Sequence, residues 1–181
     1  MLMPVIALTL MCLSARREGV IFRQTRIGLQ GQPFTIYKFK TMREEMSQKM
    51  LFAVREAESS GQLYKHVADP RVTHFGRLLR RTSIDELPQL WNVLVGDMSL
   101  VGPRPLMPHM VDFRNDLHRE RHSVKPGLTG LWQIRSRHRN TKADEMLSDD
   151  LEYIRDWYSL KGNLVILFKT IPAIVSARGA V

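Results

Sequence analysis

The sequence predicts a single compact α/β domain with a small β-hairpin and several helices lying at a membrane surface. At 181 residues and 44% hydrophobic, the chain can bury one good core. Residues 19–42 contain short apolar and alternating runs joined by glycines, which indicates strands. The last apolar segment, residues 164–175, is typical of a helix that lies on a core or on a membrane surface.

The chain is strongly basic. Its 27 lysines and arginines exceed its 18 aspartates and glutamates, which gives a formal net charge of +9. This balance suits nucleic acid, anionic lipid headgroups or phosphorylated substrates, and it does not choose among them. Cys12 is the only cysteine, so an internal disulfide is excluded and a reducing, cytosol-facing location is the simpler interpretation.

The N-terminal segment, residues 1–13, is apolar apart from Pro4 and Thr9 and is followed by Arg16 and Arg17. As a helix it would be about 20 Å long, whereas a bilayer core needs about 30 Å, so it cannot span. A buried core helix, a monotopic anchor and one half of a longer membrane element remain open. Basic residues directly after the apolar run are typical of a cytosolic membrane face.

Two strands are expected in the first part of the chain, over residues 20–22 and 34–39, joined through the glycine-containing residues 26–33. Lys38 and Lys40 alternate with aromatic residues, so both emerge from one face of the second strand. For either lysine, a solvated strand face and a binding role remain open.

Residues 43–59 favour a polar helix that loses its pattern in a serine- and glycine-containing stretch. Asp69 and Pro70 then form a turn that leads into a helix over residues 75–81. Asp69 could be only a turn-capping residue, which is the usual role of an aspartate before proline.

The stretch from residue 77 to residue 106 carries the strongest functional signal. A basic helical face leads into adjacent carboxylates, Asp85 and Glu86, and an arginine follows further on. Cations on both sides of a carboxylate pair suit a site that handles a polyphosphate together with a divalent metal.

The same carboxylates have a structural interpretation. Ser83 and Glu86 have the spacing of a capping box, and acidic side chains complement the dipole of a helix start. Because Pro88 is tolerated only near a helix start, a helix beginning around residues 83–86 is expected. Neighbouring helical residues diverge by about 100°, so Asp85 and Glu86 could divide the work as nucleophile and metal ligand. The local pattern leaves both interpretations open.

Arg104 lies between Pro103 and Pro105 and follows Gly102. Prolines on both sides fix the backbone around one charge, which a simple surface loop rarely needs. Since the planar guanidinium suits phosphate, Arg104 is predicted to bind an anion.

Later segments give weaker signals. His118 and His122 share a helical face, but Glu120 is misplaced for a zinc-binding motif, so a solvated charged helix over residues 114–121 is favoured. The basic residues 135–139 form either a solvated loop or a contact with a phosphate or a lipid headgroup.

Seven segments, taken in this order, resemble the bacterial sugar transferases that act as monotopic polyprenyl-phosphate phosphoglycosyl transferases. The resemblance covers nearly the whole chain and includes the Thr-Ser-Ile-Asp-Glu-Leu-Pro-Gln run and the Gly-Pro-Arg-Pro turn. The matching segments are residues 19–28, 37–42, 69–73, 80–92, 96–105, 125–130 and 157–160.

The resemblance implies a two-step reaction that initiates glycoconjugate assembly. Asp85 would attack a UDP-sugar and carry the phosphosugar covalently until polyprenyl phosphate accepts it. Glu86 would hold Mg²⁺ beside the diphosphate. The phosphate oxygens would be held by the cations Lys38, Arg80 and Arg104, with Asp69 as a weaker candidate in the same site.

The resemblance also implies a re-entrant N-terminal helix that breaks at a proline, where Pro4 stands. We therefore expect residues 1–18 to be a remnant that lacks half of this helical hairpin, and residues 19–181 to be a catalytic domain. The expected location is the cytoplasmic face of the inner membrane, in contact with membrane lipids.

Two rival functions come from other classes. A basic, non-catalytic peripheral membrane-binding scaffold would explain the charge and the apolar ends, but not the carboxylates between fixed arginines. A nucleic-acid binder is disfavoured because the basic residues show no regular aromatic stacking pattern, so no nucleic-acid partner is expected. The sequence specifies neither the sugar nor the oligomeric state, and a homodimer stays open.

Overall fold

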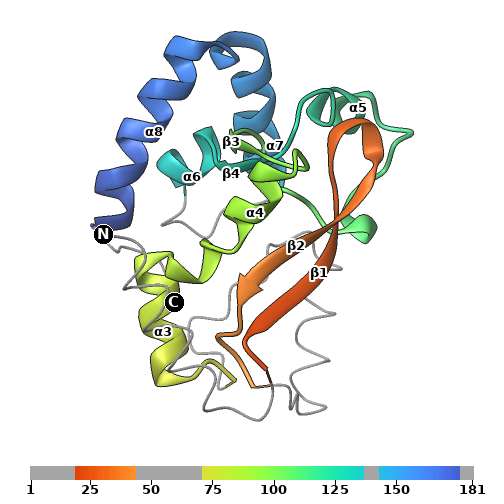
Figure 1. Ribbon diagram of the computed structural model, residues 1–181. Helices are drawn as coiled ribbons and strands as arrows, with labels where there is room; N and C mark the ends of the chain where they lie inside the picture. Colours follow the sequence, from red (N-terminus) through yellow and green to blue (C-terminus); the bar gives the residue numbers. More distant parts are fainter. Residues whose placement is uncertain (1–18, 44–70, 137–142, 176–181) are drawn as a thin grey trace.

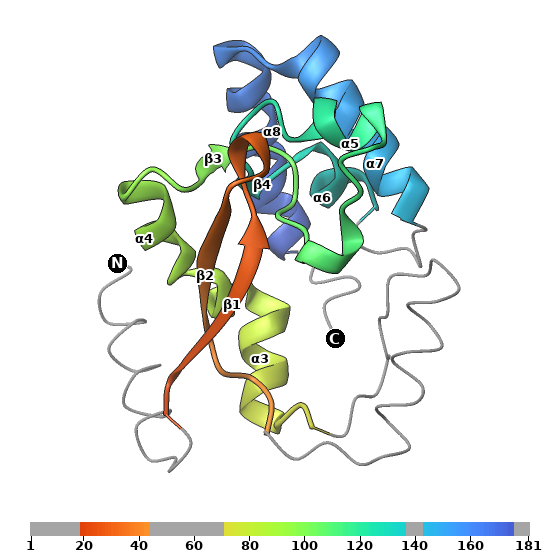
Figure 2. The same ribbon diagram turned by 90° about the vertical axis from the view of Figure 1, so that its right-hand side faces the viewer.

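The computed structural model describes residues 19–43, 71–136 and 143–175 (Figure 1). These residues form two small two-stranded sheets and a set of mostly short helices. A hairpin of β1 (Ile21–Ile27) and β2 (Pro33–Phe39) runs along the molecule. Helix α3 (His74–Thr82) lies beside one end of the hairpin, and the later helices gather at the other end (Figures 1 and 2). The predicted mixed domain with a small hairpin is confirmed.

The antiparallel hairpin pairs Ile21 with Phe39 and Ile27 with Pro33. Its turn includes Gly31 at φ 80°, a left-handed conformation that glycine adopts without strain. A Cβ on Gly31 would lie 2.8 Å from the Phe113 ring, so this position also needs the small residue for close packing. The hairpin tip is thereby held against the segment that precedes α5 (Asp116–Arg121).

Helix α3 begins at a Thr73 cap, whose hydroxyl accepts the Gly76 N–H at 2.9 Å. It ends at Ser83, which is left-handed with φ 57° and donates its backbone N–H to the Arg80 carbonyl. A 3₁₀ turn, η2 (Ile84–Glu86), follows directly. The predicted capping box is therefore wrong: Ser83 ends one helix, and its side chain does not cap the next.

The second helix of this region, α4 (Gln89–Leu94), starts only after Pro88. It is joined to the hairpin through Asn92, which is fully buried. The Asn92 side-chain amide donates to the Thr35 carbonyl at 2.7 Å and to the Asp97 carboxylate at 3.2 Å. Its carbonyl oxygen accepts the Tyr37 N–H at 3.3 Å, so α4 is fixed to β2.

The second sheet was not predicted, because its strands are only three residues long. It pairs β3 (Ser99–Val101) with β4 (Gly127–Thr129) in parallel. Gly102, directly after β3, packs backbone to backbone against both ends of β4. A Cβ on Gly127 would lie 2.1 Å from the Gly102 nitrogen, and one on Gly130 would lie 2.3 Å from the Gly102 oxygen. Glycines therefore permit the proline-rich turn to seat against β4.

Most of the remaining elements are helical and pack around a core of Val101, Leu131, Tyr153 and Ile166. The predicted helix over residues 114–121 corresponds to α5. The apolar tail forms a helix as predicted, although it begins at residue 160. The remaining elements are η3 (Pro108–Met110), α6 (Leu131–Ser136), α7 (Ala143–Glu152), the π-helical η4 (Tyr153–Trp157) and α8 (Leu160–Val175).

Within the three described ranges, no helix combines the length and apolar character that crossing a bilayer requires. Several expectations fall outside those ranges and stay predictions. They are the membrane remnant at residues 1–18 with Pro4, most of the polar helix at residues 43–59, the role of Asp69, and the loop beyond Ser136.

Candidate active site

The carboxylate pair lies on the turn between α3 and α4. Asp85 and Glu86 are both half-buried in η2. The apolar residues on either side of them, Ile84 and Leu87, pack against the cluster formed by Phe39 and Leu79. Ile84 and Leu87 thus anchor the turn on the apolar cluster, and the Asp85 and Glu86 side chains between them stay partly exposed.

Two predicted cations meet at Glu86. The Lys38 ammonium lies 2.8 Å from Glu86 Oε1, and Nη1 of Arg104 lies 4.0 Å from the same oxygen. The side chains of Lys38 and Glu86 are 18% and 17% exposed, and that of Arg104 is 35% exposed. Because these three side chains still reach solvent, the phosphate of a ligand could take the place of Glu86 as the partner of Lys38 or Arg104.

Arg80 holds the other side of the turn to the hairpin. Its Nε donates to the hydroxyl of Thr41 at 3.0 Å, just beyond the end of β2. A bridge between Met42 and Val72 pairs the same segment with the residues before α3. Arg80 is therefore placed at the C-terminal end of α3, where the chain turns into η2.

Arg104 is fixed from two directions. Its guanidinium lies over the Trp132 ring, 5.6 Å from the centroid, in a cation–π contact. Its carbonyl accepts a hydrogen bond from Arg121, whose guanidinium is also paired with Asp150 at 2.6 Å. The side chains of Arg121 and Asp150 are 2% and 1% exposed. The turn predicted to present one arginine is thus held by a buried ion pair as well as by its prolines.

Burial shifts the pKa of two groups beneath this turn. It raises the pKa of Asp150 to about 6, although the Arg121 guanidinium acts in the opposite direction. Burial also lowers the pKa of His122 to about 4, opposed by the hydrogen bond from its Nδ1 to the His118 carbonyl at 2.6 Å. His122 is therefore neutral at pH 7.

Arg26 is a cation of this site to which the sequence interpretation gave no role. It donates to the Pro105 carbonyl at 3.2 Å and to Gln24 Oε1 at 2.6 Å. Burial, followed by the neighbouring charge of Arg104, lowers the pKa of Arg26 to about 10, whereas Glu86 acts to raise it. Once the hairpin register is known, Arg26 and Lys38 fall on the same face, which is the signal that could have identified Arg26.

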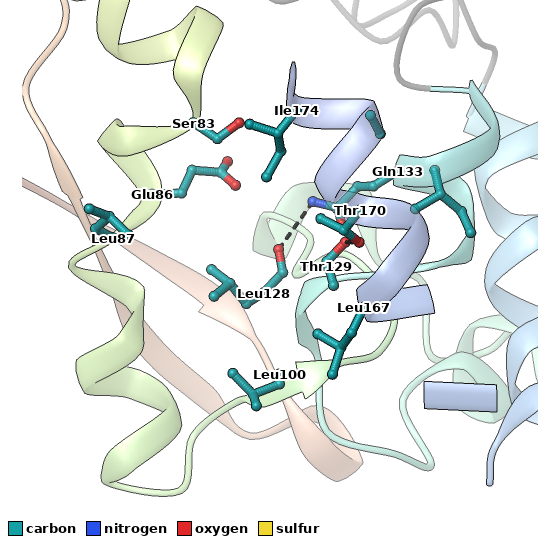
Figure 3. A pocket seen from close by; sticks show the side chains of 12 residues that line it. Ser83, Glu86, Leu87, Leu100, Leu128, Thr129, Gln133, Leu167, Thr170 and Ile174 are labelled. Atoms are coloured by element: carbon teal, nitrogen blue, oxygen red, sulfur yellow. Dashed lines mark hydrogen bonds between the residues drawn. The ribbon is translucent and has the colours of Figure 1, made fainter. Parts of the chain in front are cut away.

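A pocket of about 180 Å³ adjoins the carboxylate turn (Figure 3). Its walls come from η2 and the residues beside it, the middle of β3, β4, α6 and α8. Ser83 and Glu86 direct their polar ends into it on one side, opposite Ile174, while leucine side chains occupy the other end. The complete lining is Ser83, Glu86, Leu87, Leu100, Leu128, Thr129, Gln133, Ile134, Leu167, Thr170, Ala173 and Ile174.

The donor set suits a cation that is shared with a substrate. Among the described residues, no three His, Cys, Asp or Glu side chains form a cluster that could hold a metal alone. Mg²⁺, however, is commonly held by one or two carboxylates together with substrate phosphates and water. Asp85 and Glu86 on one half-buried turn meet that requirement.

The paired histidines do not form a metal site in this structure. His118 Nδ1 accepts a hydrogen bond from the Asp112 backbone N–H at 2.9 Å, and His122 Nδ1 donates one to the His118 carbonyl at 2.6 Å. These contacts explain both rings as parts of the α5 region, and the zinc interpretation is not supported.

The structure thus brings together Lys38, Glu86 and Arg104 and places Asp85 on the same turn. Fixed cations around a carboxylate turn are an arrangement that suits phosphorylated ligands. The model of the family described as bacterial sugar transferase matches residues 1–177. The chain therefore belongs to the bacterial sugar transferase family.

Individual relatives agree with this assignment. Galactosyl transferase CpsE of Streptococcus agalactiae serotype III (strain NEM316) is 41% identical over 91% of this chain and 37% of its own length. The uncharacterized sugar transferase EpsL of Bacillus subtilis (strain 168) is 41% identical over 88% of this chain and 72% of its own. UDP-glucose:undecaprenyl-phosphate glucose-1-phosphate transferase of Escherichia coli (strain K12) is 43% identical over 84% of this chain and 32% of its own length. The chain thus spans about a third of two of these relatives and most of the other.

Proposed function

We propose that this protein transfers a phosphosugar from a UDP-sugar to polyprenyl phosphate, giving polyprenyl-diphosphate-sugar and UMP. The observation that carries the proposal is the carboxylate turn, where Glu86 lies 2.8 Å from Lys38 and 4.0 Å from Arg104. The family membership supports the reaction class. The names of two relatives specify galactosyl and glucose-1-phosphate transfer, so the proposal covers the class of sugar and not one member of it.

In the first step, a carboxylate oxygen of Asp85 attacks the phosphorus that carries the sugar. An O–P bond forms to Asp85, and the bond to the bridging oxygen breaks, so its electron pair leaves with UMP. In the second step, a phosphate oxygen of the polyprenyl phosphate attacks the same phosphorus. The bond to Asp85 breaks and its carboxylate is regenerated, which divides one displacement into two.

The cations of the site hold phosphate oxygens during both steps. Lys38 and Arg104 exchange part of their contact with Glu86 for contacts with the diphosphate, and Arg80 supports the other side of the turn. Arg104 is suited to this because its backbone carbonyl and its guanidinium are both fixed. Asp69, which lies outside the described residues, remains a candidate for the same site.

Glu86, with phosphate oxygens of the substrate, would hold Mg²⁺, which when bound neutralises charge on the diphosphate. The Lys38 contact has to loosen for this, and the exposure of both side chains permits it.

We further propose that the protein works on the cytoplasmic face of the inner membrane, in contact with membrane lipids. The net charge of +9 favours an anionic lipid surface. Large apolar side chains also stand exposed on α8, including Leu164, Phe168 and Ile171. The division into a membrane segment at residues 1–18 and a catalytic domain at residues 19–181 belongs to the same proposal.

The test is the release of UMP from a panel of UDP-sugars with Mg²⁺, including UDP-glucose and UDP-galactose, with and without undecaprenyl phosphate. Wild-type protein in lipid is compared with Asp85→Asn. Without acceptor, one UMP per protein is expected from the wild type and none from Asp85→Asn. A labelled phosphosugar on Asp85, identified by mass spectrometry, would establish the covalent step.

Turnover that survives in Asp85→Asn would remove Asp85 as the nucleophile. If a folded, vesicle-bound wild-type protein releases no UMP from any UDP-sugar, the reaction itself fails. A non-catalytic membrane-binding scaffold would then be the better explanation.

A further inference from the structure

The pocket beside Glu86 has a lining that fits one kind of ligand. Its walls are mainly aliphatic, and the leucines Leu100, Leu128 and Leu167 gather at the end away from Glu86 (Figure 3). A ligand with a charged head at the carboxylate turn and an apolar body inside the pocket would match this arrangement.

The hydroxyl protons of the two threonines inside the pocket are used within the protein, and so is one amide proton of Gln133, whereas the Gln133 side-chain oxygen is buried without a partner. Thr170 donates its hydroxyl proton to the Ile166 carbonyl at 2.8 Å. Because a hydroxyl has one proton, the 2.8 Å bond between Thr129 and Thr170 must use the proton of Thr129. The Gln133 amide donates to the Leu128 carbonyl at 3.2 Å.

These bonds argue against a sugar in this pocket. A sugar ring would lose the hydrogen bonds of several hydroxyl groups to water. The threonines have no proton left to donate, and the unpartnered Gln133 oxygen could accept from only one or two of these groups. Burying such groups without partners is costly. An apolar group has no such requirement and gains by leaving water.

The size of the pocket gives a second indication. At about 180 Å³ it is slightly larger than an apolar cavity of about 150 Å³ that takes up benzene. An isoprene unit has one carbon fewer than benzene, so the pocket has room for about one unit. A long prenyl chain would have to leave the pocket after that unit.

Helix α8 provides the surface along which such a chain can continue. At about 100° per residue, Leu167 and Ile174, which line the pocket, lie directly beside Ile171 and Leu164 on the helix surface. Ile171 is 60% exposed and Leu164 is 46% exposed. The apolar lining thus continues without a break onto an exposed apolar stripe.

We propose that this pocket binds the first isoprene unit of the polyprenyl phosphate acceptor, with the rest of the chain lying along the exposed stripe of α8. The phosphate then lies at the rim beside Glu86, within reach of the cations Lys38 and Arg104. This inference rests on the proposed function and adds the subsite that distinguishes the acceptor from the sugar donor.

The test fills the pocket. Ala173→Phe places an aromatic ring inside it, and Ala143→Phe, the same change at the start of α7, is the matched control because Ala143 does not line the pocket. Both are assayed in detergent with UDP-sugar, using geranyl phosphate and undecaprenyl phosphate as acceptors. Because the clash is at the first unit, the KM for both acceptors should rise by about tenfold or more in Ala173→Phe. The KM for UDP-sugar should change by less than about threefold.

Each alternative gives its own pattern. A larger change in the KM for UDP-sugar would mean that the pocket holds the sugar. A defect with undecaprenyl phosphate alone would mean that the substitution disturbs a lipid surface and not the first unit. Either result, or an unchanged KM for both acceptors, overturns the proposal. If the wild type releases no UMP even without acceptor, the proposed function has failed first.

A second measurement does not depend on the folding of a variant. Geranyl phosphate carrying a diazirine on its first unit is photolysed with the wild-type protein, and the labelled peptides are identified by mass spectrometry. Labels are expected on the pocket leucines and on Ile174, and undecaprenyl phosphate should compete. Labels elsewhere, or competition by a phospholipid but not by undecaprenyl phosphate, would contradict the assignment.

Discussion

Two ion pairs contact Arg104 in the Gly-Pro-Arg-Pro turn, one through its guanidinium and one through its carbonyl, and they differ in exposure. Lys38 and Glu86 are 18% and 17% exposed, whereas Arg121 and Asp150 are 2% and 1% exposed. The partly exposed pair of Lys38 and Glu86 can exchange partners with a substrate, and the buried pair cannot. The comparison thus assigns Glu86 to the proposed reaction and Asp150 to the stability of the turn that carries Arg104.

The buried pair should show the largest effect on stability. Arg121→Met leaves the Asp150 carboxylate buried without its partner, which should lower the free energy of unfolding by about 3–5 kcal/mol. Urea unfolding of the full chain measures this. The double variant Arg121→Met/Asp150→Leu should recover much of the loss, because no buried charge remains. A loss below about 1 kcal/mol in the single variant would show that the pair is not what holds the turn.

The exposed pair should behave in the opposite way. Glu86→Gln should reduce UMP release by about 10²- to 10³-fold, since it removes the carboxylate that is proposed to hold Mg²⁺ beside the diphosphate. It should change the free energy of unfolding by only about 1 kcal/mol, because glutamine keeps an oxygen that can accept from Lys38 and both side chains still reach water. Kinetics and urea unfolding on the same preparation make the comparison. A stability loss like that of Arg121→Met would erase the distinction between the two pairs.

His122 tests the buried side through pH. Its pKa is lowered from 6.5 to about 4 in the folded protein, so between these values the unfolded chain binds a proton that the folded protein does not. The contribution of His122 is therefore present above pH 6.5 and is lost as pH falls to 4, by at most about 3 kcal/mol. Arg121 and His118 lie near the His122 ring, and their electrostatic effect also disfavours its protonated form.

The measurement is the free energy of unfolding of wild type minus that of His122→Gln, from pH 7 to pH 4. Taking the difference cancels the pH-dependent contribution of Asp150, which is present in both proteins. Because the pKa of Asp150 is raised to about 6, its contribution to stability grows as pH falls, the reverse of that of His122. The difference should shrink as pH falls. A difference that stays constant with pH would mean that His122 does not titrate as a buried group.

Arg104→Lys should give the smallest effect of this set. Lysine keeps the charge but loses the planar fork and the contact over Trp132. The KM for UDP-sugar should rise by about tenfold, with little change in stability. Steady-state kinetics beside Arg114→Lys, at an arginine that is 95% exposed, provides the control. An unchanged KM would mean that Arg104 acts only as a point charge.

Local signals in the sequence were sufficient for part of the fold. Alternating residues and glycines predicted the hairpin, and a helix was predicted over residues 75–81, where α3 is found at His74–Thr82. The three-residue strands β3 and β4 were not predicted, because their pairing depends on the close approach of Gly102 and Gly127, which are far apart in the sequence. Ser83 was misinterpreted because the spacing of a capping box does not reveal a left-handed backbone.

The sequence by itself determined the chemical groups of the site: adjacent carboxylates, a fixed arginine, and a basic chain. These are consequences of residue identity and short-range sterics, which act within a few positions. Only the tertiary structure decided that Lys38 contacts Glu86 across 48 positions, that Arg121 holds the Arg104 carbonyl, and that α8 closes an apolar pocket beside them. Such contacts depend on how hairpin and helices pack, and packing is set by the whole core.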